Sequence, residues 1–196
     1  MVAYIFQKIA QNNTVDNQGL SAGRDTSRRW FGEEVKNLRQ SQPKKSNPVF
    51  TSRMDYSSIG SMYLFSYDPK TKKTLPYYDT YPLVFPIKMY GDGFLGLNLH
   101  YISPLMRAKL MNELYSTLTN KKNDQSTRIR VSYELLNATS RFRYFKPCVK
   151  RYLFTHVKSR FMYISPDDWD KTIMMPTESF VGATKARVYA ESAKRF

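Results

Sequence analysis

Residues 83–101, with the sequence LVFPIKMYGDGFLGLNLHY, determine the expected fold class. Residues 83–90 are rich in apolar and aromatic side chains, and residues 94–101 alternate apolar side chains with others, as does a strand with one buried face. Gly91-Asp92-Gly93 lies between them and predicts a tight hairpin turn with positive φ at the glycines. Pro86 has no backbone N–H, which predicts an edge position or a bulge. The stretch is therefore predicted to form a β-hairpin.

A third strand is expected over residues 61–67, where SMYLFSY precedes a turn that begins at Asp68-Pro69. Three short strands with tight turns and one apolar face predict a compact β section over residues 59–102. Two architectures fit this pattern: a small SH3-like β-barrel or a curled antiparallel sheet.

Helical patterns dominate residues 103–196. Ser103-Pro104 places an N-cap residue before a proline at the first helical position, and apolar residues follow at intervals of four: Met106, Leu110, Leu114 and Leu118. Pro147 is predicted to open a second helix, residues 160–164 to form a strand, and residues 183–194 to form a terminal helix. The fold class is therefore α+β.

The first 58 residues are predicted to form a separate N-terminal arm. Residues 11–23 and 40–52 are polar segments that bury little surface. Between them, a short helix is expected near residues 25–39, with one apolar stripe formed by Trp30, Phe31, Val35 and Leu38. Residues 59–196 are expected to form one α+β core domain.

The charge of the chain points to an anionic partner. It has 31 Lys and Arg residues against 16 Asp and Glu residues, a net charge of +15. The single cysteine, Cys148, fits folding in a reducing cytoplasm, and the N-terminus does not resemble a signal peptide. No apolar run approaches the roughly 18 residues needed to cross a bilayer, so no membrane partner is expected.

Catalytic signals are weak. The two histidines, His100 and His156, have no metal-ligand spacing and are expected to be structural. Cys148 is expected to be a small core residue. Glu34-Val35-Lys36 resembles part of a nuclease site but lies in the predicted short helix without a clustered acid. We therefore expect a non-enzymatic protein without cofactor or metal.

A basic region from residue 121 to residue 160 is the predicted binding surface. It contains eleven Lys or Arg residues and two acids, Asp124 and Glu134. On the helix predicted from Pro147, Lys146, Lys150, Phe154 and Lys158 recur every four positions opposite the apolar stripe. Such a face could follow a phosphate backbone; the alternative is a solvated helix face. The residues predicted to contact double-stranded DNA or an acidic protein surface are Arg141, Arg143, Lys146, Lys150, Arg151, Lys158 and Arg160.

Several segments resemble a virion protein family of T-even-like contractile-tailed phages. The resemblance covers residues 24–196 and is most specific at Pro76-Tyr77-Tyr78-Asp79 and Gly96-Leu97-Asn98-Leu99-His100-Tyr101. It implies a virion component, made in the host cytoplasm, that contacts DNA or other phage structural proteins. Two roles are compatible with it: a DNA end protector near the head–tail connection, or a structural protein of the neck, tail or baseplate.

Overall fold

The structure is a computed structural model and describes residues 59–118, 134–139, 141, 143–165, 168, 169, 172 and 178–194. Its elements are β1 (Met62–Leu64), β2 (Tyr78–Asp79), β3 (Leu83–Tyr90), β4 (Gly93–Asn98), η3 (Leu99–Tyr101), α3 (Pro104–Leu118), η4 (Arg143–Cys148), β5 (Val149–Leu153), η5 (Phe154–His156), β6 (Met162–Ile164), β7 (Phe180–Val181) and α6 (Lys185–Lys194), where η marks a 3-10 helix. Residues 134–139 are also helical. The predicted arm of residues 1–58, with its short helix near 25–39, lies outside the described residues.

An antiparallel sheet of five strands, in the order β5-β4-β3-β1-β6, forms the centre of the fold. The predicted hairpin is its middle, with β3 paired to β4 from Val84–Asn98 to Tyr90–Gly93. The register shifts between Pro86 and Lys88, so Pro86 lies at a bulge, as predicted. Within the described residues no pairing joins β5 to β6. The sheet is therefore open: of the two predicted architectures, it agrees with an antiparallel sheet and not with a closed barrel.

The hairpin turn differs from the prediction. Neither Gly91 nor Gly93 has a positive φ; among the described residues the positive-φ glycines are Gly60 and Gly182. Gly93 is required for another reason, because a Cβ at this position would lie 1.9 Å from the carbonyl oxygen of Tyr152. The backbones of β4 and β5 thus approach too closely here for any side chain.

The helix predicted to begin at Pro147 is also wrong. Pro147 lies inside η4, and the residues that follow form β5, which pairs with β4 from Leu97–Val149 to Gly93–Leu153. In this strand Val149 contacts the main core and Tyr152 is buried on the opposite face of the sheet. Aromatic and β-branched side chains fit a pleated strand, and pairing with β4 overrides the helical spacing.

Three other predicted elements are confirmed. The long helix α3 begins at Pro104, where the N–H of Arg107 donates to the carbonyl of Ser103. The strand predicted within residues 160–164 is β6, and the terminal helix is α6. The α+β class is therefore correct, although residues 103–196 contribute strands β5, β6 and β7 as well as helices.

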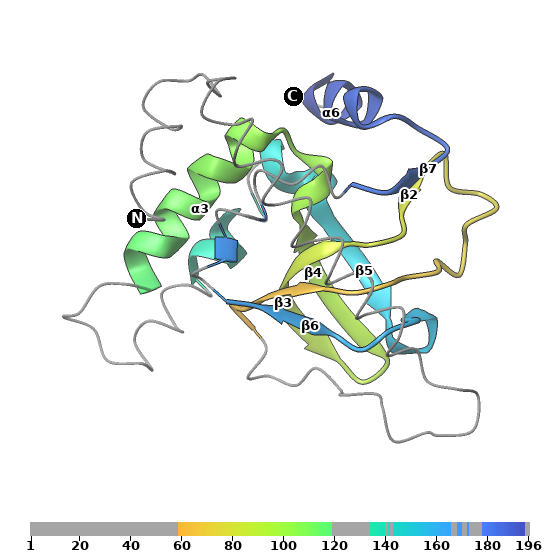
Figure 1. Cartoon of the computed structure of the whole chain (residues 1–196), viewed down its shortest axis with the longest axis horizontal. Helices are drawn as coiled ribbons and strands as arrows, with labels where there is room; N and C mark the ends of the chain where they lie inside the picture. Colours follow the sequence, from red (N-terminus) through yellow and green to blue (C-terminus); the bar gives the residue numbers. More distant parts are fainter. Residues whose placement is uncertain are drawn as a thin grey trace.

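Apolar side chains pack on both faces of the sheet. One face carries the main core and is covered by α3; its buried residues include Leu64, Phe85, Leu97, Met111 and Leu114. The other face carries a smaller aromatic cluster, which includes Phe65, Phe94 and Tyr152. Figure 1 shows α3 to the left of the sheet and α6 at the top of the molecule, near the small sheet of β2 and β7.

Candidate functional site

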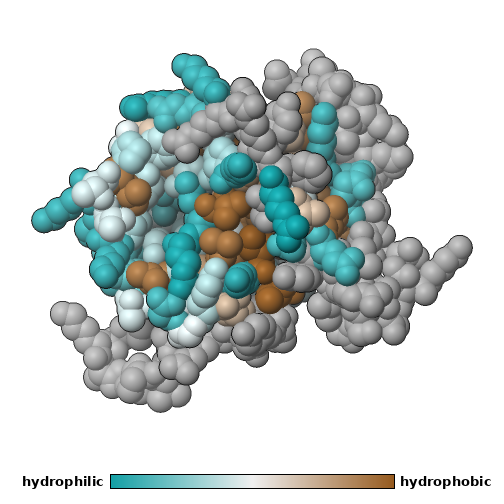
Figure 2. Space-filling model, turned by 180° about the vertical axis from the view of Figure 1, so that it is seen from behind, coloured by the Kyte–Doolittle hydropathy of each residue, from teal (hydrophilic) through white to brown (hydrophobic). Residues whose placement is uncertain are grey.

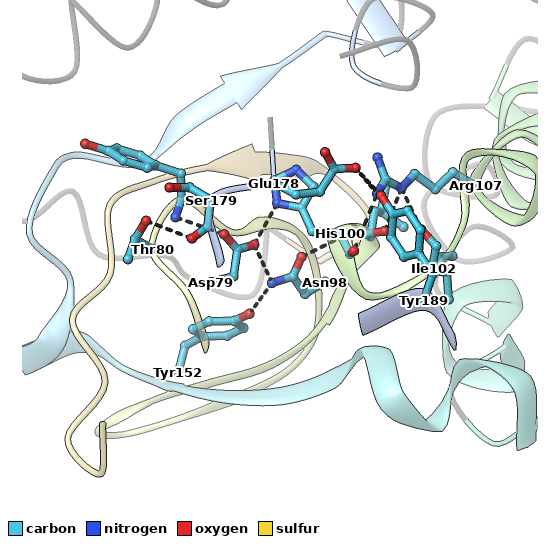
Figure 3. Close-up of polar contacts among 12 residues, drawn as sticks. Asp79, Thr80, Asn98, His100, Ile102, Arg107, Tyr152, Glu178, Ser179 and Tyr189 are labelled. Atoms are coloured by element: carbon cyan, nitrogen blue, oxygen red, sulfur yellow. Dashed lines mark hydrogen bonds and ion pairs between the residues drawn. The ribbon is translucent and has the colours of Figure 1, made fainter. Parts of the chain in front are cut away.

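A buried polar group lies where β2, β4 and β5 meet (Figure 3). Asp79 Oδ2 lies 2.6 Å from His100 Nδ1 and accepts a 3.1 Å hydrogen bond from Asn98 Nδ2. The same amide donates to the Tyr152 hydroxyl at 3.0 Å. Burial raises the pKa of Tyr152 well above its ordinary value. All four side chains are buried, so they join the strands rather than contact a macromolecule.

A second buried group ties the C-terminal part of the chain to α3 (Figure 3). Arg107 Nε donates to the carbonyls of Leu99 (2.7 Å) and Ile102 (3.0 Å). Its Nη2 donates to the Tyr189 hydroxyl at 2.7 Å and to a carboxylate oxygen of Glu178. Burial alone would raise the pKa of Glu178. The nearby charge of Arg107 and the hydrogen bonds from Tyr189 and Arg107 have a larger, opposite effect, so the pKa falls to about 2.

Both histidines are hydrogen-bonded, as predicted. His100 contacts Asp79, and His156 Nδ1 lies 2.8 Å from the carbonyl oxygen of Asp68. Cys148 is a buried core residue, also as predicted, and burial raises the pKa of its thiol to about 12. Across the described ranges, no three His, Cys, Asp or Glu side chains gather as a metal site would require. Nor does any helix in those ranges have the length and apolar content of a bilayer span.

The predicted basic residues do not share a helical face. Lys150 and Arg151 are neighbours in β5, so their side chains project from opposite faces of the sheet. The Lys150 ammonium lies 4.1 Å from the centroid of the buried Tyr101 ring. Arg141 is helical and Arg143 is the first residue of η4.

Arg151 takes part in an exposed cluster at the end of the β3–β4 hairpin. Its guanidinium carbon lies 4.1 Å from the centroid of the Tyr90 ring, and the Lys88 ammonium lies 5.3 Å from the same centroid. Arg151 Nη2 also forms an ion pair with the carboxylate of Asp92. We call Lys88, Tyr90 and Arg151 the hairpin patch. It combines an aromatic ring with two cations, a pattern suited to nucleic acid.

Lys158 lies beside the turn that follows β1. Its N–H donates to the Ser66 carbonyl at 2.8 Å. In that turn, Lys72 pairs with Asp68 at 2.8 Å, and this hydrogen bond lowers the pKa of Asp68. We call the exposed cations here the turn patch: Lys70, Lys72, Lys73, Lys158 and Arg160. Two distant segments, each with exposed cations, thus lie side by side.

The short helix η5 lies between the two patches. The N–H of Phe154, at its start, donates to the carbonyl of Asp92 at 3.0 Å, and the N–H of Asp68 donates to the carbonyl of His156, at its end, also at 3.0 Å. Together the patches form what we call the basic edge. It carries seven exposed Lys or Arg residues against the acids Asp68 and Asp92.

The basic edge lies at the end of the sheet distant from α3. Figure 1 shows the turn after β1 and the chain around η5 on the right of the molecule. Figure 2 shows the molecule from behind, and hydrophilic side chains project from the corresponding left margin, whereas apolar side chains gather in the centre of that face. A charged ligand would therefore meet cations first on this side.

The structure brings three of the seven predicted residues into the basic edge: Arg151, Lys158 and Arg160. Arg141 and Lys146 are exposed elsewhere, in the helical residues before β5, and Lys150 faces Tyr101. Sequence reasoning missed four cations of the edge: Lys70, Lys72, Lys73 and Lys88. Lys70, Lys72 and Lys73 lie in a turn that the sequence does predict. The concentration of lysines in this turn was the sequence signal that could have identified them as part of a basic surface.

Comparison with known proteins identifies the family. The family model described as phage T4 terminal DNA protecting protein matches residues 2–194. The comparisons with curated proteins and with solved structures give no match. The family match confirms the resemblance to T-even-like phage proteins and, between its two roles, favours the DNA end protector. The chain belongs to the phage T4 terminal DNA protecting protein family.

Proposed function

We propose that this protein binds the ends of linear double-stranded phage DNA through the basic edge and shields them from exonuclease without catalysing a reaction. The observation that carries this proposal is the presence of seven exposed cations on four segments of the chain that meet around η5. The family description gives the DNA terminus as the target.

The chemistry of the basic edge fits a phosphate backbone. Five of its cations are lysines, which act as mobile point charges and contact phosphates without reading the bases. Binding of such a surface releases counterions from the duplex, so affinity depends steeply on salt and little on sequence. We therefore expect the protein to protect blunt ends of unrelated sequences equally well.

Charge reversal tests the basic edge. The triple variant Lys70→Glu, Lys73→Glu, Lys158→Glu changes three exposed residues of the turn patch and leaves the Lys72–Asp68 pair intact. We expect the slope of log affinity against log salt to fall by about three, or roughly one per lost phosphate contact. Exonuclease protection of a blunt linear duplex should be lost at protein concentrations that protect with the unaltered chain.

A matched variant separates local contacts from net charge. Lys109→Glu, Lys185→Glu and Lys194→Glu reverse three exposed lysines on α3 and α6, so the total charge changes by the same amount. Equal loss in both triple variants would contradict the basic edge as the binding surface. A further variant, Arg141→Glu with Lys146→Glu, measures the contribution of the predicted cations outside the edge.

The alternative is a structural role in the phage neck, tail or baseplate without DNA contact. Absence of duplex binding even at low salt would favour it. Mass spectrometry of purified DNA-free tails provides an independent measurement. A protein that follows the genome end should be absent from these particles, whereas a structural subunit should be present at a fixed multiple.

A further inference from the structure

Tyr90 is an exposed aromatic residue at the end of a largely buried strand. From Leu83 to Ile87 every residue of β3 is buried, but the side chain of Tyr90 is 40% exposed at the end of the hairpin. The planar guanidinium of Arg151 covers the ring at 4.1 Å, and Asp92 holds that guanidinium in place by an ion pair. The hairpin patch therefore presents flat groups and positive charge to the solvent.

We propose that the hairpin patch is the subsite for the terminal base pair of the duplex; this inference rests on the proposed function. A duplex end differs from an internal segment because it exposes the flat, apolar face of one base pair next to phosphates of both strands. An aromatic ring and a guanidinium plane stack on such a face, and the ammonium of Lys88 neutralises an adjacent phosphate. The lysines of the turn patch contact only backbone, which is the same at ends and inside the duplex.

The two patches thus divide the work of binding. The turn patch supplies affinity for any duplex, and the hairpin patch supplies preference for an end. Hydrogen bonds of 3.0 Å at both ends of η5 hold the two patches in a fixed relation, so that one duplex contacts both. Changes in the two patches should therefore have different consequences for linear and circular DNA.

The test compares affinity for a blunt linear duplex with affinity for a covalently closed circle of the same sequence and length. We expect the full chain to prefer the linear form. Tyr90→Ala should lower affinity for the linear duplex by about tenfold, the range of one aromatic–base stack, and lower affinity for the circle much less, because a circle has no terminal base pair. Tyr90→Phe keeps the ring and should keep the preference. The triple lysine variant of the turn patch should weaken binding to both forms alike.

Two further variants serve as control and as second measurement. Tyr163 on β6 is 54% exposed, and its ring centroid lies 5.9 Å from that of Tyr63. Tyr163→Ala therefore removes an exposed tyrosine outside the hairpin patch and should keep the preference for linear DNA. Arg151→Lys keeps the charge but removes the guanidinium plane, and should reduce the preference. Circular dichroism and thermal melting of each variant establish that it is folded.

The outcomes separate the inference from the function on which it rests. A preference for linear DNA that survives both Tyr90→Ala and Arg151→Lys would overturn the assignment of the hairpin patch and leave end protection intact. Equal affinity of the unaltered chain for linear and circular DNA would overturn both. Loss of the preference in Tyr90→Ala and not in Tyr163→Ala would support the terminal base-pair subsite.

Discussion

Replacement of Glu178 by Gln removes the carboxylate that neutralises the buried Arg107, and we expect the free energy of unfolding to fall by about 3 kcal/mol. The side chains of Arg107 and Glu178 are 0% and 2% exposed. The pKa of Glu178 is lowered from 4.5 to about 2, which corresponds to roughly 3 kcal/mol. This agrees with the roughly 3–5 kcal/mol lost when one partner of a buried ion pair is removed. For a chain of this size the melting temperature should fall by about 6–12 °C.

The contribution of Glu178 to the free energy of unfolding should decrease as the pH falls. Because the folded protein holds the pKa of Glu178 below its ordinary value, the carboxylate binds its proton more readily in the unfolded chain. Its stabilisation is therefore complete above about pH 5 and is lost as the pH falls from 4.5 toward 2. The difference in unfolding free energy between the unaltered chain and Glu178→Gln should shrink over this range, as measured by urea titration at each pH.

Two comparisons make the result decisive. Glu191→Gln removes the partner of the exposed Arg187 on α6 and should cause no measurable change. The double variant Arg107→Met with Glu178→Leu leaves no unpaired charge and should recover part of the stability lost in Glu178→Gln. Recovery is incomplete because the carbonyls of Leu99 and Ile102 lose their donor. A loss smaller than about 1 kcal/mol at pH 7, or one that does not change with pH, would refute the assigned role of the ion pair.

Two further predictions concern the sheet and the thiol. Gly93→Ala places a Cβ against the Tyr152 carbonyl and should destabilise the protein by about 1–3 kcal/mol in urea titrations. Gly91→Ala has nothing within 4 Å of the new Cβ and should have little effect, so equal losses in the two variants would contradict the close approach of β4 and β5. Cys148 should not react with a colorimetric thiol reagent at pH 8 until the chain is unfolded, because burial raises its pKa to about 12; rapid reaction of the folded protein would show that the thiol is accessible.

The sequence predicts local structure well where the signals for an element lie within that element or next to it. The strand expected over residues 83–90 is β3, and the helix start at Pro104 is observed at that residue. Each depends on alternation, turn residues or capping within a few positions. β5 was missed because Val149, Leu153 and Val157 also fit a helical spacing, and the pairing partner that decides for a strand lies more than fifty residues earlier, in β4.

The candidate site is less predictable because its residues come from several segments. The lysine turn is visible in the sequence, but its position beside Lys158 depends on the bridge between Tyr67 and Val157. Nothing in the sequence near Glu178 identifies Arg107 as its partner. A signal did exist on α3, since Arg107 occupies the same helical stripe as Met111 and Leu114, where a charged residue requires a buried partner.

The ion pair between Arg107 and Glu178 has a consequence for folding during translation. A nascent chain that stops short of residue 178 has already made α3, yet the guanidinium that belongs inside the fold has no counter-charge. A chain that stops before residue 162 also lacks β6, the strand that pairs with β1, so its central sheet is incomplete. Such non-local closure slows folding and leaves strand edges open to other chains while translation continues. Glu178 and Tyr189 therefore complete the fold only after the rest of the domain has been synthesised. Chains shortened before residue 178 should accumulate as aggregates instead of partly active protein.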